Sequence, residues 1–109
     1  MANTITLPDL RKIRINDPLF SHYAGKVAKK MIPVQWDILN GKGSSKCFCI
    51  DNFRVAAGEL DAPHRGVVFG DTDAYKWLEA VAFCAGNGEE DFLPQADSLI
   101  DLLERAQQK

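Results

Sequence analysis

The sequence predicts a mainly α-helical fold built from helical hairpins. Apolar residues recur at spacings of three and four in four segments, which is the period of one helix face. Short loops rich in Gly, Asn and Pro separate these segments, and sustained alternation of polar and apolar residues is almost absent. Two helix pairs in succession favour stacked hairpins.

The only period-two pattern lies at the N-terminus. Residues 3–7 alternate polar and apolar side chains, and Pro8 ends the pattern. We therefore expect residues 1–8 to form a short edge strand or arm, which would need a partner strand elsewhere.

The first helix is expected to begin at Pro18. Asp17 precedes it as a capping residue, and Pro18 suits the first helical position because its missing N–H would have no partner there. Pro33 costs this element one hydrogen bond, so we expect a kink or a split near it. The apolar positions of this segment are Phe20, Tyr23, Val27, Met31, Val34, Ile38 and Leu39.

The middle of the chain predicts two further helices. Residues 40–45 are the clearest loop, residues 50–60 fit a short helix that Gly58 interrupts, and residues 67–69 form an apolar, extended run. A helix over about 74–85 should follow, with capping candidates and negative charge at 70–73. Residues 86–88 suit a left-handed C-terminal cap.

The last helix is expected over about 93–107. Its apolar positions cover more than half of its circumference, which implies neighbours on two sides. Asp101 and Arg105 are spaced for a weak surface pair. Apolar faces this wide, left uncovered, predict self-association.

Composition limits the class of protein. The chain has 109 residues and a mass of 12.1 kDa, which allows one domain. The 13 basic and 15 acidic side chains give a net charge of −2 without a basic run, so we expect no nucleic-acid partner. The apolar stretches are far shorter than a membrane span, and no apolar signal core precedes Ile15. We therefore expect a cytoplasmic protein without a membrane partner.

Acidic residues at the start of the 74–85 helix are candidates for sugar chemistry. Asp71, Asp73 and Glu79 form an acidic cluster, and glycoside hydrolysis uses paired carboxylates. The more common explanation is ordinary helix capping. Tyr75, Lys76 and Trp77 are candidates for a polar and aromatic sugar platform, although a Trp on such a helix is more often in the core.

The three cysteines, Cys47, Cys49 and Cys84, are too few for a disulfide framework. The C-x-C pair at 47 and 49 can supply two thiolates to a soft metal, but a complete zinc site needs further ligands. His64 and Cys84 do not stand at a recognisable ligand spacing. Free cysteines are the favoured interpretation, and a metal-binding domain is a distant alternative.

Three stretches, taken in order, resemble the N-terminal segment of glycoside hydrolase family 127, the β-L-arabinofuranosidase family. They are residues 32–40 (IPVQWDILN), 52–58 (NFRVAAG) and 68–80 (VFGDTDAYKWLEA). The helix over 97–108 is similar to the one that closes that segment. The resemblance covers the chain from residue 17 onward.

The resemblance implies a catalytic domain that is an α/α six-barrel, followed by β-sandwich domains. It also implies retaining hydrolysis of β-L-arabinofuranosides by a zinc-bound cysteine nucleophile and a glutamate acid/base. In the family these residues lie further along the chain, so we assign no catalytic residue, metal ligand or cofactor here. Zinc is implied only for full-length members, and the three cysteines do not match their zinc ligands.

Three departures from the family pattern matter. Cys47-Phe48 replaces a frequent Ser-His, Gly70 replaces a frequent Gln, and the chain ends at Lys109 where the family continues into a Pro-Asp-Gly-Tyr turn. We therefore interpret residues 1–109 as a single partial domain that is inactive alone.

The expected substrate of the full-length protein is an arabinose-containing oligosaccharide. We name Asp71, Asp73 and Lys76 as candidate substrate-binding residues. The alternative is a free-standing, non-catalytic helical interaction module derived from that fold.

Overall fold

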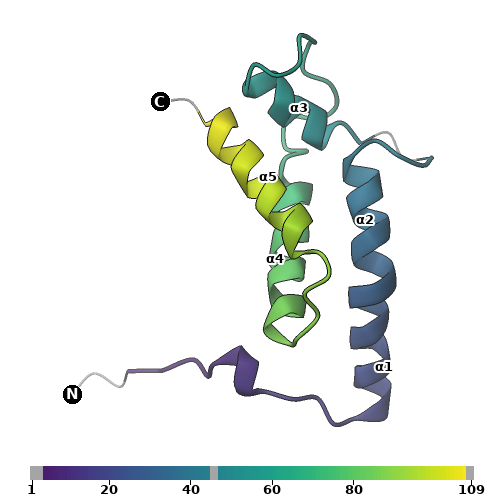
Figure 1. Ribbon diagram of the computed structural model, residues 1–109, viewed down its shortest axis with the longest axis vertical. Helices are drawn as coiled ribbons and strands as arrows, with labels where there is room; N and C mark the ends of the chain where they lie inside the picture. Colours follow the sequence, from purple (N-terminus) through teal and green to yellow (C-terminus); the bar gives the residue numbers. More distant parts are fainter. Residues whose placement is uncertain (1–3, 45–46, 108–109) are drawn as a thin grey trace.

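The structure, a computed structural model, describes residues 4–44 and 47–107, and every regular element within them is helical (Figure 1). This confirms the predicted helical class. Along the chain lie a 3-10 helix η1 (Leu10–Lys12), α1 (Pro18–Lys26), a π-helix η2 (Val27–Met31), α2 (Ile32–Leu39), α3 (Cys49–Ala56), α4 (Thr72–Gly86) and α5 (Leu93–Ala106).

The elements α1, η2 and α2 form one continuous helical rod (Figure 1). Asp17 caps it as predicted, because its carboxylate accepts hydrogen bonds from the backbone N–H groups of Leu19 and Phe20 at 2.9 and 3.1 Å. The predicted disturbance near Pro33 takes the form of a π turn. In that turn the Ile32 N–H bonds to the Val27 carbonyl, so the register widens just before Pro33, which supplies no N–H.

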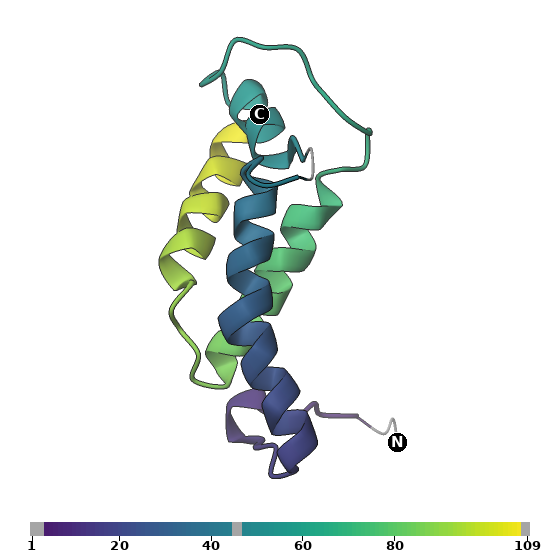
Figure 2. The same cartoon turned by 90° about the vertical axis from the view of Figure 1, so that its right-hand side faces the viewer.

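The core lies where α2, α3 and α5 pack on α4 (Figure 2). At its centre the rings of Trp36 and Trp77 stack with their centroids 4.6 Å apart. The buried residues are Ile32, Leu39, Cys49, Ile50, Ala74, Trp77, Val81, Ala96, Leu99 and Leu102.

The helix α4 begins at Thr72, two residues before the predicted start near Ala74, and its predicted cap is not formed. Asp71 occupies the N-cap position with helical backbone angles and no capping hydrogen bond from its side chain. The Thr72 hydroxyl instead donates to the Phe69 carbonyl at 2.9 Å. Residues 68–71 form a turn, so the predicted extended run over 67–69 was wrong.

The end of α4 follows the prediction. Gly88 adopts a φ of +90°, a left-handed conformation that glycine tolerates without a steric cost. The N–H of Gly88 bonds to the Ala85 carbonyl and that of Glu89 to the Cys84 carbonyl, at 2.9 and 3.0 Å. These two bonds make the Schellman cap that satisfies the last carbonyls of the helix.

The predicted N-terminal edge strand is absent from the described residues. Residues 4–9 have no regular structure, and Ile5 and Leu7 are 88% and 84% exposed. An edge strand needs a partner for its backbone groups, and residues 4–44 and 47–107 offer none. Residues 1–3 of the predicted segment lie outside the described range. The arm continues into η1, which contacts α4 (Figure 1).

The helix α5 has neighbours on two sides, α3 and α4, as its wide apolar face predicted. The predicted side-chain pair between Asp101 and Arg105 was wrong. The Arg105 guanidinium pairs with Glu59 at 2.6 Å and donates to the main-chain carbonyl of Asp101 at 3.0 Å. The fold brings Glu59 to α5 from 46 residues away, and sequence spacing cannot reveal such a partner.

The molecule is open in shape. Its radius of gyration is 16.9 Å, whereas a compact domain of this length has about 13 Å. No residue of α1 is buried, and Leu19, Phe20 and Tyr23 are each more than half exposed. Within the described residues, no helix combines the length and the apolar character needed to cross a bilayer.

Candidate functional site

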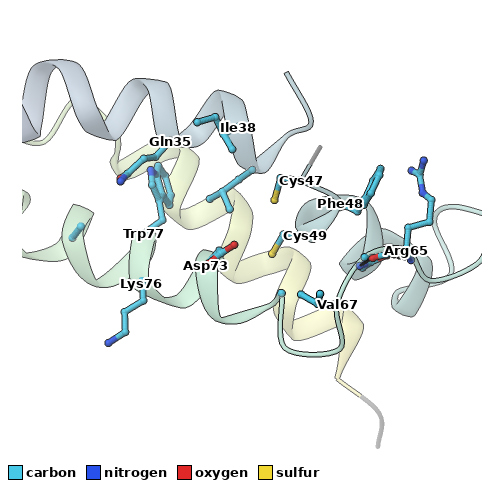
Figure 3. A pocket seen from close by; sticks show the side chains of 15 residues that line it. Gln35, Ile38, Cys47, Phe48, Cys49, Arg65, Val67, Asp73, Lys76 and Trp77 are labelled. Carbon is cyan, nitrogen blue, oxygen red and sulfur yellow. Dashed lines mark hydrogen bonds between the residues drawn. The ribbon is translucent and has the colours of Figure 1, made fainter. Parts of the chain in front are cut away.

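A groove of about 560 Å³ lies between α2, the first turns of α4 and the segment that contains α3 (Figure 3). Its wall is mixed, with aliphatic and aromatic carbon beside amide, carboxylate, ammonium and thiol groups. Such a mixture suits a small polar ligand with apolar faces. The lining residues are Gln35, Ile38, Leu39, Cys47, Phe48, Cys49, Asn52, Arg65, Gly66, Val67, Gly70, Asp73, Lys76, Trp77 and Ala80.

Two of the three candidate substrate-binding residues line this groove. Asp73 and Lys76 lie one turn apart on α4, and both side chains are exposed. The Asp73 carboxylate turns toward Cys49, and the Lys76 side chain extends outward along the rim (Figure 3). The Lys76 ammonium pairs with Glu79 at 3.3 Å, which keeps that charge beside the groove.

The third candidate, Asp71, is not among the lining residues. It interacts with the Tyr75 hydroxyl instead. Partial burial raises the pKa of Tyr75, and the hydrogen bond to Asp71 raises that pKa further. The structure therefore separates Asp71 from the pair formed by Asp73 and Lys76.

The loop that closes the far end of the groove is held by one amide side chain. Asn52 donates to the Arg65 carbonyl at 2.8 Å and accepts from the Arg65 N–H at 3.0 Å. The Arg65 guanidinium then lies 4.3 Å from the centre of the Phe48 ring and pairs with Asp51 at 3.2 Å. These contacts fix a positive charge at the groove edge.

Trp77 belongs to the core. Only 3% of its surface is exposed, and its indole N–H donates to the Ile32 carbonyl at 3.0 Å. This burial confirms the core interpretation, since a sugar platform must present an open ring face. Trp77 is also among the residues that line the groove, with little of its surface exposed.

The cysteines lie at two separate places. Cys47 and Cys49 line the groove, whereas Cys84 lies ten residues along α4 from Ala74, whose N–H faces the Cys49 sulfur. Ten helical residues span about 15 Å. Burial raises the pKa of Cys49 to about 11, and the nearby Cys47, Asp73 and Asp71 add to this increase. Cys49 is therefore a protonated thiol at neutral pH.

These residues do not fit the zinc site that the family implies. Structural and catalytic zinc sites need at least three protein ligands that lose their protons on binding. In the described residues, no three His, Cys, Asp or Glu side chains gather closely enough to hold a metal ion. The pair Cys47 and Cys49 supplies two ligands, one of them hard to deprotonate.

Sequence reasoning missed several groove residues. Gln35, Asn52 and Arg65 carry no local signal for binding, because each depends on a contact made by the fold. Gln35 and Asn52 lie in the stretches 32–40 and 52–58 that resemble family 127, and that resemblance was the available indication. The bond of Asn52 to Arg65 joins residues 13 positions apart, across the end of α3 and the segment after it, and follows no helical spacing.

Comparisons with known proteins agree on one family. Residues 12–109 match the family model described as the β-L-arabinofuranosidase GH127 catalytic domain. The non-reducing end β-L-arabinofuranosidase of Bifidobacterium longum subsp. longum is 32% identical over 111 residues, which covers 88% of this chain and 17% of the relative.

A crystal structure of a GH127 β-L-arabinofuranosidase from Geobacillus stearothermophilus T6 has the same fold over the shared part. The TM-score is 0.76 with 41% sequence identity, and the match covers 87% of this chain and 15% of that one. The chain thus spans about one sixth of the length of these relatives. By its sequence and by its fold, the chain belongs to the GH127 β-L-arabinofuranosidase family.

Proposed function

We propose that this chain supplies part of the wall of a carbohydrate-binding cleft in a GH127-type catalytic domain. The ligand is an arabinose-containing oligosaccharide, and Asp73 and Lys76 are the groups that meet it. The observation that carries the proposal is the groove itself, since two residues named from the sequence line it together.

The chemistry of the groove supports a sugar ligand. A carboxylate accepts hydrogen bonds from hydroxyl groups, an ammonium donates to them, and the amides of Gln35 and Asn52 do both. Ile38 and Val67 offer carbon surface for the apolar faces of a furanose ring. Asp71, which lies outside the lining, contributes through its contact with Tyr75 beside the rim.

The same groove argues against hydrolysis by this chain alone. Most glycosidases use two carboxyl groups that flank the scissile bond, and the mechanism implied by the resemblance to family 127 uses a zinc-bound cysteine with a glutamate. Among the described lining residues, Asp73 is the single carboxylate. The thiol of Cys49 is protonated at neutral pH, so it is a poor nucleophile there. We therefore propose that residues 1–109 form a partial domain of an α/α six-barrel and are inactive alone.

Binding and turnover should be measured separately. We expect no hydrolysis of a chromogenic β-L-arabinofuranoside, and we expect methyl β-L-arabinofuranoside to shift the amide NMR signals of residues 73 and 76. The variants Asp73→Asn and Lys76→Ala should reduce the shifts. Asp97→Asn and Lys30→Ala, which change the same charges outside the groove, should not. Reproducible turnover would contradict inactivity, and unchanged spectra would contradict the binding role.

A second function is favoured by one observation. The helix α1 has no buried residue, so its apolar side chains are available to another protein. We infer as the alternative a non-catalytic helical interaction module located in the cytoplasm. If the sugar leaves the NMR spectrum unchanged while a protein partner shifts the signals of α1, the module is the better assignment.

A further inference from the structure

Charge is divided unevenly along the chain. Residues 1–46 carry 8 basic and 3 acidic side chains, a net charge of +5, and residues 47–109 carry 5 basic and 12 acidic ones, a net charge of −7. The small total of −2 therefore hides two regions of opposite sign. Such a separation matters for association when each charge lies on an open helix face.

The basic face lies on the rod formed by α1, η2 and α2. Tyr23, Lys26, Lys30 and Val34 follow one another at spacings of three and four, and all four are exposed. Among the residues that the structure describes, Lys26 and Lys30 form no ion pair, whereas Lys29 reaches Glu89 at 3.8 Å. The exposed apolar residues beside this face are Leu19, Phe20 and Met31.

The acidic face lies on α5. Asp97, Ile100, Asp101 and Glu104 stand at positions i, i+3, i+4 and i+7 and are all exposed, with Ile100 at 52%. No carboxylate of this face has an ionic partner within the described part of the chain. The neighbouring Arg105 does not neutralise it, because its guanidinium is held by Glu59.

No ion pair joins the two faces within the described part of the chain. Both α2 and α5 pack on α4, and the turned view shows the rod and α5 as separate helices (Figure 2). The charges of each face are therefore open to a partner, and a second copy of this chain carries the opposite charge on its own face.

We propose that a second copy of this chain covers these faces in a head-to-tail contact. The basic face of one molecule, defined by Tyr23, Lys26, Lys30 and Val34, docks on the acidic face of the next, defined by Asp97, Ile100, Asp101 and Glu104. The two faces carry charges of opposite sign, and each also exposes apolar side chains. The contact is therefore both electrostatic and apolar.

The contact also stabilises α1. This part of the rod has nine residues and no buried side chain, so tertiary packing, which supplies most of the stability of helices in proteins, contributes little to it. A neighbour that covers Leu19, Phe20 and Tyr23 supplies the packing that α1 otherwise lacks. Because the joined faces differ, each new copy leaves one face of each kind free, and the assembly grows with concentration.

Sedimentation velocity over a wide concentration range tests this arrangement. We expect association that grows with protein concentration and weakens about tenfold in dissociation constant between ~0.1 M and ~1 M salt, since the Debye length falls from about 10 Å to about 3 Å. A monomer at every concentration, or association that salt does not weaken, would overturn the proposal and leave the faces to a different occupant.

A charge exchange provides the decisive comparison. The variants Lys26→Glu/Lys30→Glu and Asp97→Lys/Asp101→Lys should each remain monomeric, and their equimolar mixture should associate again because the opposite charges are restored across the contact. Lys12→Glu/Arg14→Glu changes the net charge by the same amount as Lys26→Glu/Lys30→Glu, but on the N-terminal arm, and it should associate like the unmodified chain. Failure of the mixture to associate, with both variants folded by circular dichroism, would refute the pairing.

Discussion

The indole N–H of Trp77 donates a hydrogen bond to the main-chain carbonyl of Ile32 at 3.0 Å, in the buried contact between α4 and α2. The two residues are 45 positions apart, so this bond fixes the register of α2 against α4. In the same contact the ring of Trp36, on α2, stacks on the ring of Trp77. The groove lies along this helix pair, which makes the bond a determinant of its shape.

Removal of this hydrogen bond should lower stability. Trp77→Phe keeps an aromatic ring in the core but leaves the Ile32 carbonyl without its side-chain donor, and we expect a loss of about 1–2 kcal/mol in the free energy of unfolding. Trp77→Ala should cost about 3–5 kcal/mol because it also opens a cavity. Urea denaturation followed by circular dichroism measures both losses.

Trp36→Phe serves as the matched control. It keeps the aromatic stack, and the Trp36 indole donates no hydrogen bond within the described residues, so the variant should cost less than Trp77→Phe. An equal loss for the two substitutions would show that ring volume, and not the bond to Ile32, sets the stability of this contact.

The second prediction concerns the two hydrogen bonds between the Asn52 side chain and the Arg65 backbone. Asn52→Ala removes both hydrogen bonds to the Arg65 backbone, so the amide of Arg65 should exchange its hydrogen faster. Asn52→Asp keeps an acceptor for that N–H and should retain much of the protection. Hydrogen exchange observed by NMR distinguishes the two variants. If the Ala and Asp variants exchanged alike, the side chain of residue 52 would not hold the loop.

Much of the helical architecture follows from local rules. Asp17 and Pro18 mark the start of α1, and residues 86–88 mark the end of α4, because capping depends on neighbours in sequence. The predicted edge strand over 1–8 is not formed by residues 4–8, and the reason is non-local. Alternation of polar and apolar residues gives a strand only where a partner strand exists. The pair of Arg105 with Glu59 escaped prediction for the same reason.

The candidate site was predictable only in part. Asp73 and Lys76 share a helix, so their shared place in the groove follows from spacing. Asp71 lies two residues earlier, at the start of the helix, and interacts with Tyr75 instead. Arg65 reaches the groove through Asn52 and Phe48, and those contacts exist only once α3 and the following loop have folded.

The third prediction concerns alkaline pH. The pKa of Cys49 rises from its ordinary value of 9.0 to about 11 because the thiol is buried. Above pH 9 the unfolded chain loses this proton while the native chain keeps it, so the free energy of unfolding falls as pH rises from 9 to 11. The loss attributable to this group is on the order of 2 kcal/mol.

Cys49→Ala should flatten this part of the stability curve, although it lowers the stability at neutral pH. Urea denaturation in the presence of a reductant, repeated between pH 8 and pH 11, gives the slope for each variant. Cys84→Ala, at a half-buried thiol whose pKa is also raised by burial, should keep most of the slope. An unchanged slope in Cys49→Ala would mean that other groups cause the alkaline loss.

The last prediction compares two glycines at the end of α4. Gly88 has a φ of +90°, so Gly88→Ala forces an L side chain into the left-handed region and should lower the free energy of unfolding by about 1 kcal/mol. Gly86 ends the helix without a positive φ, and a Cβ added there meets no atom within 4 Å. Gly86→Ala should therefore stabilise the protein by about 0.5–1 kcal/mol. Thermal denaturation of the two variants should give shifts of opposite sign, and shifts of the same sign would contradict the Schellman cap at Gly88.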